Sequence, residues 1–125
     1  MNFYIASSFA NKELVRYVAL KLTVKGYKHT YDWTINQQAI DMKTLKVIGE
    51  AEKRAIAACD IFILLLPAGK GSHTELGLAL ALEKDIYIYS PENAEGDLAI
   101  SFYYVDGVKR FHGKIDDFLV TIGLA

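Results

Sequence analysis

The chain has 125 residues, of which 52% are hydrophobic and 23% are charged, and its formal net charge is −1. These values predict a single globular domain over residues 1–125 and exclude a disordered chain. The near-neutral charge gives no basic surface, so a nucleic acid polymer is not expected as a partner. The longest apolar run, residues 61–67, is too short to cross a membrane, and the first residues lack the basic start of a signal peptide. We therefore expect a soluble cytoplasmic protein.

Strands and helices are expected to alternate along the chain. Short apolar runs bounded by turn residues predict strands at residues 2–6, 27–31, 60–66, 85–89 and 102–105. Apolar residues at helical spacing predict helices that end at Gly26 and near Lys84, a helix over residues 41–59 and a last helix over 115–122. This alternation is typical of βαβ units, which build a parallel sheet with helices on both faces.

Five strands in a chain of this length predict an α/β fold, a flavodoxin-like doubly wound parallel sheet with strand order 2-1-3-4-5. Such sheets bind ligands at the carboxyl ends of their strands, at the point where the strand order reverses. Here that point lies between the first and third strands. The loops that follow these strands, residues 6–9 and 67–72, are therefore expected to flank a crevice.

Glu75 lies in the stretch GKGSHTELGLALA, residues 69–81, directly after the most apolar run of the chain. Locally, Ser72 and Glu75 have the spacing of a capping box, with Ser72 as the N-cap and Glu75 as the third helical residue. Chemically, Glu75 is a carboxylate at the carboxyl end of a buried strand, where a helix N-terminus would keep it ionised. Close packing of the helix on the sheet would account for Gly77.

A second carboxylate, Glu52, falls in the helix predicted over residues 41–59. At about 100° per residue, it lies within an apolar stripe of that helix. The stripe consists of Leu45, Ile48, Ala55 and Cys59. A carboxylate on a core-facing stripe is costly unless it is paired or faces a cavity. Two interpretations stay open: Glu52 reaches solvent from the edge of the stripe, or it faces Glu75 across a pocket.

Two carboxyl groups in one crevice are the arrangement that glycosidic bond cleavage uses. One carboxylate attacks the anomeric carbon, and the other carboxyl group protonates the leaving group. With Glu75 as the nucleophile, Glu52 is the predicted acid.

The segment ACDIFILLLPAGKGSHTELGLALALEKDIYIY, residues 58–89, resembles the nucleoside 2-deoxyribosyltransferase family. That family includes relatives that hydrolyse the N-glycosidic bond of deoxynucleoside monophosphates. The opening FYIASSF and the later YDWT are similar to family members as well, so the resemblance extends over residues 3–90. It implies an enzyme that cleaves an N-glycosidic bond through a covalent glycosyl intermediate.

By this resemblance, Glu75 would attack C1′ of a 2-deoxyribosyl unit, and a second base or water would then release the sugar. The family's acid is an aspartate eight residues before the aspartate that opens the central strand, a position occupied here by Glu52. Tyr4, Ser7 and Ser8 correspond to residues that position the sugar and its 5′ end. A neighbouring subunit often completes the family's active site, so a homo-oligomer is expected.

The turn before Glu75 departs from the family's Gly-x-Gly-x-Glu pattern, because His73 takes the place of a glycine. Six residues before Glu75, the family often has an Asp or Ser that contacts the sugar or phosphate, and this chain has Gly69. The candidate substrate-binding residues are therefore Tyr4, Ser7, Ser8, Asp32, Trp33, Gly69, Gly71, Ser72 and His73. Trp33 is included because its ring could stack on a base.

Two other functions stay open, a glycosidase acting on NAD or another ribosyl nucleotide and a non-catalytic nucleotide-binding module. In each case the expected partner is a small nucleoside or nucleotide, and no cofactor is expected. His29 and His112 are expected at the surface, and no histidine pair has the spacing of metal ligands.

Overall fold

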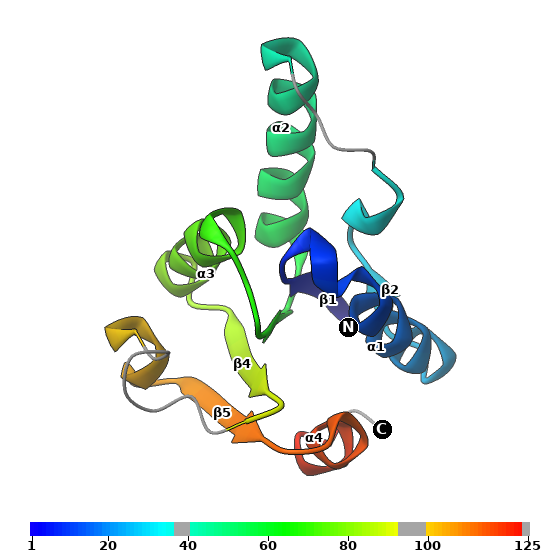
Figure 1. The fold of residues 1–125 in the computed structure, drawn as a ribbon, viewed down its shortest axis with the longest axis vertical. Coiled ribbons are helices and arrows are strands. Elements are labelled where there is room, and N and C mark those ends of the chain that lie inside the picture. Colours follow the sequence, from blue (N-terminus) through cyan, green and yellow to red (C-terminus); the bar gives the residue numbers. More distant parts are fainter. Residues whose placement is uncertain (37–40, 93–99, 124–125) are drawn as a thin grey trace.

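The computed structural model describes residues 1–36, 41–92 and 100–123. Five parallel strands form one sheet in the order β2-β1-β3-β4-β5 (Figure 1). The strands are β1 (Asn2–Ala6), β2 (Lys28–His29), β3 (Ile61–Leu65), β4 (Asp85–Ser90) and β5 (Val108–His112). The predicted α/β fold and its strand order are confirmed. Phe3 pairs with Ile61, and Ile61 pairs with Asp85, so β3 lies between β1 and β4.

Helices cover both faces of the sheet (Figure 1). They are α1 (Lys12–Val24), α2 (Met42–Ala58), α3 (Lys70–Ala81) and α4 (Ile115–Thr121). Helices α2 and α3 contact each other on one face, and Tyr17 of α1 donates a hydrogen bond to Asp116 of α4 on the other. Within the described residues, no helix is both long and apolar enough to span a membrane.

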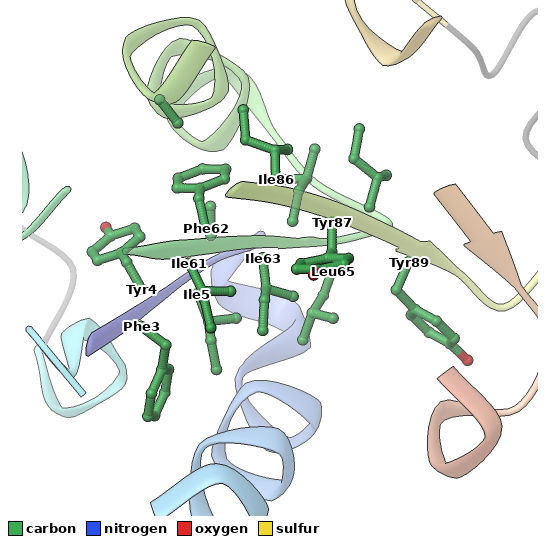
Figure 2. Close-up of a cluster of buried hydrophobic side chains, with 14 of the residues drawn as sticks. Phe3, Tyr4, Ile5, Ile61, Phe62, Ile63, Leu65, Ile86, Tyr87 and Tyr89 are labelled. Atoms are coloured by element: carbon green, nitrogen blue, oxygen red, sulfur yellow. The ribbon is translucent and has the colours of Figure 1, made fainter. Parts of the chain in front are cut away.

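Side chains of the central strands alternate between the two helical layers, as a strand's period of two requires. Figure 2 shows Tyr4 and Phe62 on the side of α3, with Phe3 and Ile63 on the side of α1. All four side chains are 0% exposed. The continuous apolar run of β3 is therefore buried on both faces, which is typical of a parallel strand. Tyr4 is the polar exception, and its hydroxyl needs a partner on the α2–α3 side.

The fifth strand was predicted in the wrong place. Residues 102–105 do not form a strand, because Ser101–Tyr104 is a 3-10 helix that buries Tyr103. The strand that pairs with β4 is Val108–His112, which follows a turn with Gly107 at φ +88°. Its sequence VKRFH is more polar than residues 102–105, the segment that was predicted as the strand, because β5 is an edge strand with one side open to solvent.

Helix α3 begins three residues before the predicted start. Gly69 is the N-cap and Ser72 is the third helical residue. The Ser72 Oγ accepts a 2.8 Å hydrogen bond from the Gly69 N–H and so performs the role that was predicted for Glu75. Glu75 consequently lies in the second turn. Gly77 is exposed, and no atom of the described residues lies within 4 Å of a Cβ added there, so close packing on the sheet does not explain it.

The apolar stripe predicted for α2 is buried only at its C-terminal end. Ala55 and Cys59 are 5% and 1% exposed, whereas Leu45 is 52% exposed. Figure 1 shows the reason, since the N-terminal turns of α2 extend beyond the strands. Periodicity alone does not reveal how far a helix reaches past the sheet that it covers.

His29 was expected at the surface, but its ring stacks on Phe3 with centroids 4.6 Å apart. Its Nε2 is buried and has no hydrogen-bond partner among the described residues. Burial lowers the pKa of His29, and the nearby Asp32 opposes that shift. Because the pKa of His29 is lower in the folded protein, the unfolded chain takes up this proton at a higher pH than the folded protein does. His29 therefore reduces the free energy of unfolding as the pH falls below about 6.5.

Replacement of His29 by Phe is expected to keep the ring stack and remove this cost. Relative to the wild type, the free energy of unfolding of His29→Phe should increase by less than about 1 kcal/mol between pH 7 and pH 5, because the ring is only partly buried. Urea titrations at several pH values measure this difference. A difference that stays constant from pH 7 to pH 5 would contradict the assignment.

Candidate functional site

A cavity of about 680 Å³ opens at the carboxyl ends of β1 and β3, between α2 and α3. It is lined by Ser7, Ser8, Phe9, Trp33, Gly49, Glu52, Lys53, Ile56, Gly69, Gly71, Ser72, Thr74, Glu75 and Leu78. This is the point where the strand order reverses, as the sequence predicted, and such positions hold the ligands of open α/β sheets.

Two carboxyl groups that line this cavity converge on the hydroxyl of Tyr4, which is fully buried and is not itself a lining residue. The Tyr4 hydroxyl donates to Glu75 Oε2 at 2.7 Å and lies 3.2 Å from Glu52 Oε2. Glu52 is carried by α2, Glu75 by α3 and Tyr4 by β1. The structure therefore answers the question left open for Glu52: it faces Glu75 across a pocket.

Burial decides the protonation of Glu75. It raises the pKa of Glu75 to about 8, the hydrogen bond from Tyr4 opposes this shift, and the neighbouring Glu52 adds to it. The same burial, with two carboxylates at its hydroxyl, raises the pKa of Tyr4 above its ordinary value. The raised pKa thus favours the protonated form of Glu75 within this close pair of carboxyl groups.

The predicted ionisation of Glu75 by the helix N-terminus is not supported by this arrangement. The favourable effect of a helix N-terminus on a negative charge falls off within the first turn. Because α3 begins at Lys70, Glu75 is one turn too far along the helix. Desolvation therefore outweighs the helix dipole and favours the protonated form of this carboxyl group.

The two serines after β1 tie the loops of the site together. The Ser7 hydroxyl donates to the Leu65 carbonyl at 2.7 Å and accepts from Asn11 Nδ2 at 2.9 Å. The Ser8 hydroxyl donates to the Pro67 carbonyl at 3.1 Å. Both serines line the cavity, and their hydrogen bonds hold the loop after β1 against the loop after β3.

Trp33 lines the cavity from a 3-10 helix, Trp33–Ile35, that follows β2. Its Nε1 donates to the Ile5 carbonyl at 2.7 Å, which fixes the ring against β1. Asp32 does not line the cavity. Its Oδ1 accepts from the Thr34 N–H at 3.0 Å and caps this short helix.

His73 lies on the other side of the first turn of α3. One ring nitrogen is 2.7 Å from the Gly69 carbonyl, and the other is 2.7 Å from the Tyr103 hydroxyl. The residue lines a second cavity of about 380 Å³ instead of the one that holds the carboxyl pair. His73 therefore acts on the larger cavity only through the backbone of Gly69.

Several lining residues were not singled out from the sequence. One group lies on α2 and lines the cavity together with Glu52. It consists of Gly49, Lys53 and Ile56, at −3, +1 and +4 residues from Glu52. Phe9, directly after the two serines, is 45% exposed, and its ring centroid lies 6.3 Å from that of Trp33. The helical period anchored on Glu52 could have found the first group, whereas Phe9 had no distinguishing pattern.

Charge and metal ligands are sparse around the carboxyl pair. Lys53 is the only cationic residue among the described residues that line the cavity. In the part of the chain that the structure describes, no three or more His, Cys, Asp or Glu side chains gather closely enough to hold a metal ion. The ionisable side chains that contact one another at this site are two carboxyl groups and one phenol.

Comparison with known proteins gives a family and a fold. A family model for nucleoside 2-deoxyribosyltransferases matches residues 3–108. A CMP N-glycosidase of Clostridium botulinum, BcmB, superposes with a TM-score of 0.71 at 21% identity, covering 98% of each chain. A 2-desoxiribosyltransferase from Leishmania mexicana superposes with a TM-score of 0.50 at 23% identity, covering 73% of this chain and 65% of that one.

At these identities the two structures show a shared fold. A search of curated protein sequences gave no match. The family model, in contrast, spans most of the chain, including both carboxyl groups of the cavity. The chain therefore belongs to the nucleoside 2-deoxyribosyltransferase family and is an enzyme that acts on N-glycosidic bonds.

Proposed function

We propose that the protein cleaves the N-glycosidic bond of a nucleoside or nucleoside monophosphate in two steps, through a sugar covalently attached to Glu75. The observation that carries this proposal is the convergence of Glu75 and Glu52 on the Tyr4 hydroxyl at 2.7 and 3.2 Å. Two carboxyl groups within reach of one hydroxyl are close enough for one to attack the sugar while the other serves the leaving base.

In the first step, a Glu75 oxygen bonds to C1′ as the bond from C1′ to the base nitrogen breaks. The electron pair of that bond goes to the base, which takes a proton from Glu52. In the second step, an acceptor attacks C1′ and gives its proton back to Glu52, and the bond between C1′ and Glu75 breaks. Each carboxyl group thereby returns to its starting state.

Tyr4 provides the route by which the pair reaches its reactive state. In the empty site the proton resides on Glu75, because burial raises its pKa. Attack requires an ionised Glu75 and a protonated Glu52, so a proton must move between them when substrate binds. The Tyr4 hydroxyl contacts both carboxyl groups and can accept one proton while it donates another.

The rest of the cavity suits the sugar and a 5′-phosphate. Ser7 and Ser8 offer hydroxyls, and Gly69 and Gly71 lie at the N-terminal end of α3. Backbone N–H groups at a helix N-terminus bind anions without a cationic side chain. The likeness to a CMP N-glycosidase over 98% of both chains supports a nucleoside monophosphate as substrate and water as the acceptor.

Replacement of the two glutamates separates their roles. Glu75→Gln removes the nucleophile, and we expect base release to fall at least about a thousandfold. Glu52→Gln removes the proton donor and should cost about 10² to 10⁴-fold. The measurement is chromatographic detection of free base from a panel of nucleosides, their 5′-monophosphates and NAD, and an added second base distinguishes transfer from hydrolysis.

Glu50→Gln is the matched control, because Glu50 lies on the exposed face of the same helix and does not line the cavity. It should release base at the wild-type rate. Release by Glu75→Gln within tenfold of the wild type would exclude Glu75 as the nucleophile. Release from NAD alone would replace the proposed substrate class with a ribosyl nucleotide.

The pH dependence of kcat/KM tests the shared proton. Activity should fall as the pH rises through about 8, because the carboxyl pair then loses the proton that the leaving base needs. In Tyr4→Phe, Glu75 loses the hydrogen bond that lowers its pKa, so the alkaline limb should move to higher pH while the maximal rate falls. An alkaline limb that stays in place or moves to lower pH would contradict the relay through Tyr4.

A further inference from the structure

Gly49 lies in the middle of α2 (Met42–Ala58), on the face that lines the cavity. This face consists of Gly49, Glu52, Lys53 and Ile56, at helical offsets of 0, 3, 4 and 7. Gly49 is thus one turn before Glu52, in the direction in which α2 extends beyond the sheet (Figure 1).

No structural requirement for glycine is found at this position. Gly49 has the backbone of an ordinary helical residue and is not among the glycines with positive φ. No atom of the described residues lies within 4 Å of a Cβ added there. Glycine is a poor helix former, so alanine at position 49 would stabilise α2, and its Cβ would contact no other described element.

The missing side chain instead leaves room in the cavity beside the acid. A general acid must lie within hydrogen-bond reach of the atom that it protonates, which places the leaving base at Glu52. Beyond Glu52, the next residue of α2 on the cavity side is Gly49, about 4.5 Å along the helix axis. A base that extends from Glu52 toward the N-terminal end of α2 would lie over Gly49.

We propose that Gly49 determines the size of the base that the enzyme releases and admits a base larger than an unsubstituted pyrimidine, either a purine or a pyrimidine with a bulky ring substituent. This inference rests on the proposed function, with Glu52 as the acid. The cavity of about 680 Å³ lies in the range of sites that enclose most of a drug-sized ligand. The half-exposed ring of Phe9 lines the same cavity and gives a large base an apolar face for stacking.

The test fills the space in two steps, with Gly49→Ala and Gly49→Leu, and compares adenine, 5-bromocytosine and cytosine as the bases of deoxynucleoside 5′-monophosphates. In Gly49→Leu, KM for the two larger bases should rise at least tenfold more than KM for the cytosine substrate does. Gly49→Ala should fall between the wild type and Gly49→Leu.

Stability provides the second readout. Gly49→Ala should raise Tm by about 3–5 °C, because alanine favours the helix. Gly77→Ala is the matched control, since Gly77 is a helical glycine of α3 with an equally open surrounding and does not line the cavity. It should raise Tm to a similar extent and leave the kinetics for all three bases unchanged. If Gly49→Ala raises both Tm and the KM for the larger bases, glycine at position 49 serves specificity and not the stability of α2.

Two failures are distinguishable. If the wild type cleaves its substrates and the Gly49 variants change KM equally for all three bases, or the wild type accepts only the cytosine substrate, the role of Gly49 is overturned and the proposed function stands. If no nucleotide is cleaved, the proposed function fails. Calorimetric binding of free adenine then tests Gly49 alone: at least tenfold weaker binding by Gly49→Leu supports its role, and unchanged binding overturns it.

Discussion

The contact of one phenol with two carboxyl groups is the interaction on which the site depends. Tyr4 is 0% exposed, so its hydroxyl has no water partner and must bond within the protein. Glu75 and Glu52 supply that partner, at 2.7 and 3.2 Å. Two ionised carboxylates this close, one of them largely desolvated, would repel each other, and a retained proton removes the repulsion. The need to satisfy a buried hydroxyl therefore also brings the two glutamates together.

The doubly wound topology makes this meeting possible. Strands β1 and β3 are neighbours in the sheet, α2 precedes β3, and α3 follows it. A side chain of β1 that points toward the face covered by these helices therefore lies between α2 and α3. Tyr4 has this orientation, and Figure 2 shows it on the α3 side of the sheet beside Phe62. The rigid central strands fix the phenol, while the open outer turns of α2 leave room for a ligand. In the proposed mechanism, the precise placement of the two glutamates and the space for the base thus come from different parts of the α2–α3 pair.

The sequence predicted the five-stranded order because alternating strands and helices of this number are typical of one doubly wound fold, and it singled out Glu52 and Glu75 from local patterns. A continuous apolar strand indicates burial on both faces, and Glu52 interrupts an otherwise apolar stripe. Contacts made by distant segments had no such pattern. The stack of His29 on Phe3 joins neighbouring strands, and the hydrogen bond of His73 to Tyr103 joins α3 to a segment 30 residues away. The start of α3 was misplaced because Ser72 fits either end of a capping motif, and only the backbone shows which end it occupies.

The protonation of Glu75 in the empty enzyme is the most direct test of this account. Glutamate carboxyl carbons labelled with ¹³C titrate individually by NMR, and the Glu75 signal is identified by its loss in Glu75→Gln. We expect its midpoint near pH 8, well above that of an exposed glutamate. A midpoint below about pH 5, the range of ordinary glutamates, would contradict the shared proton and with it the relay through Tyr4.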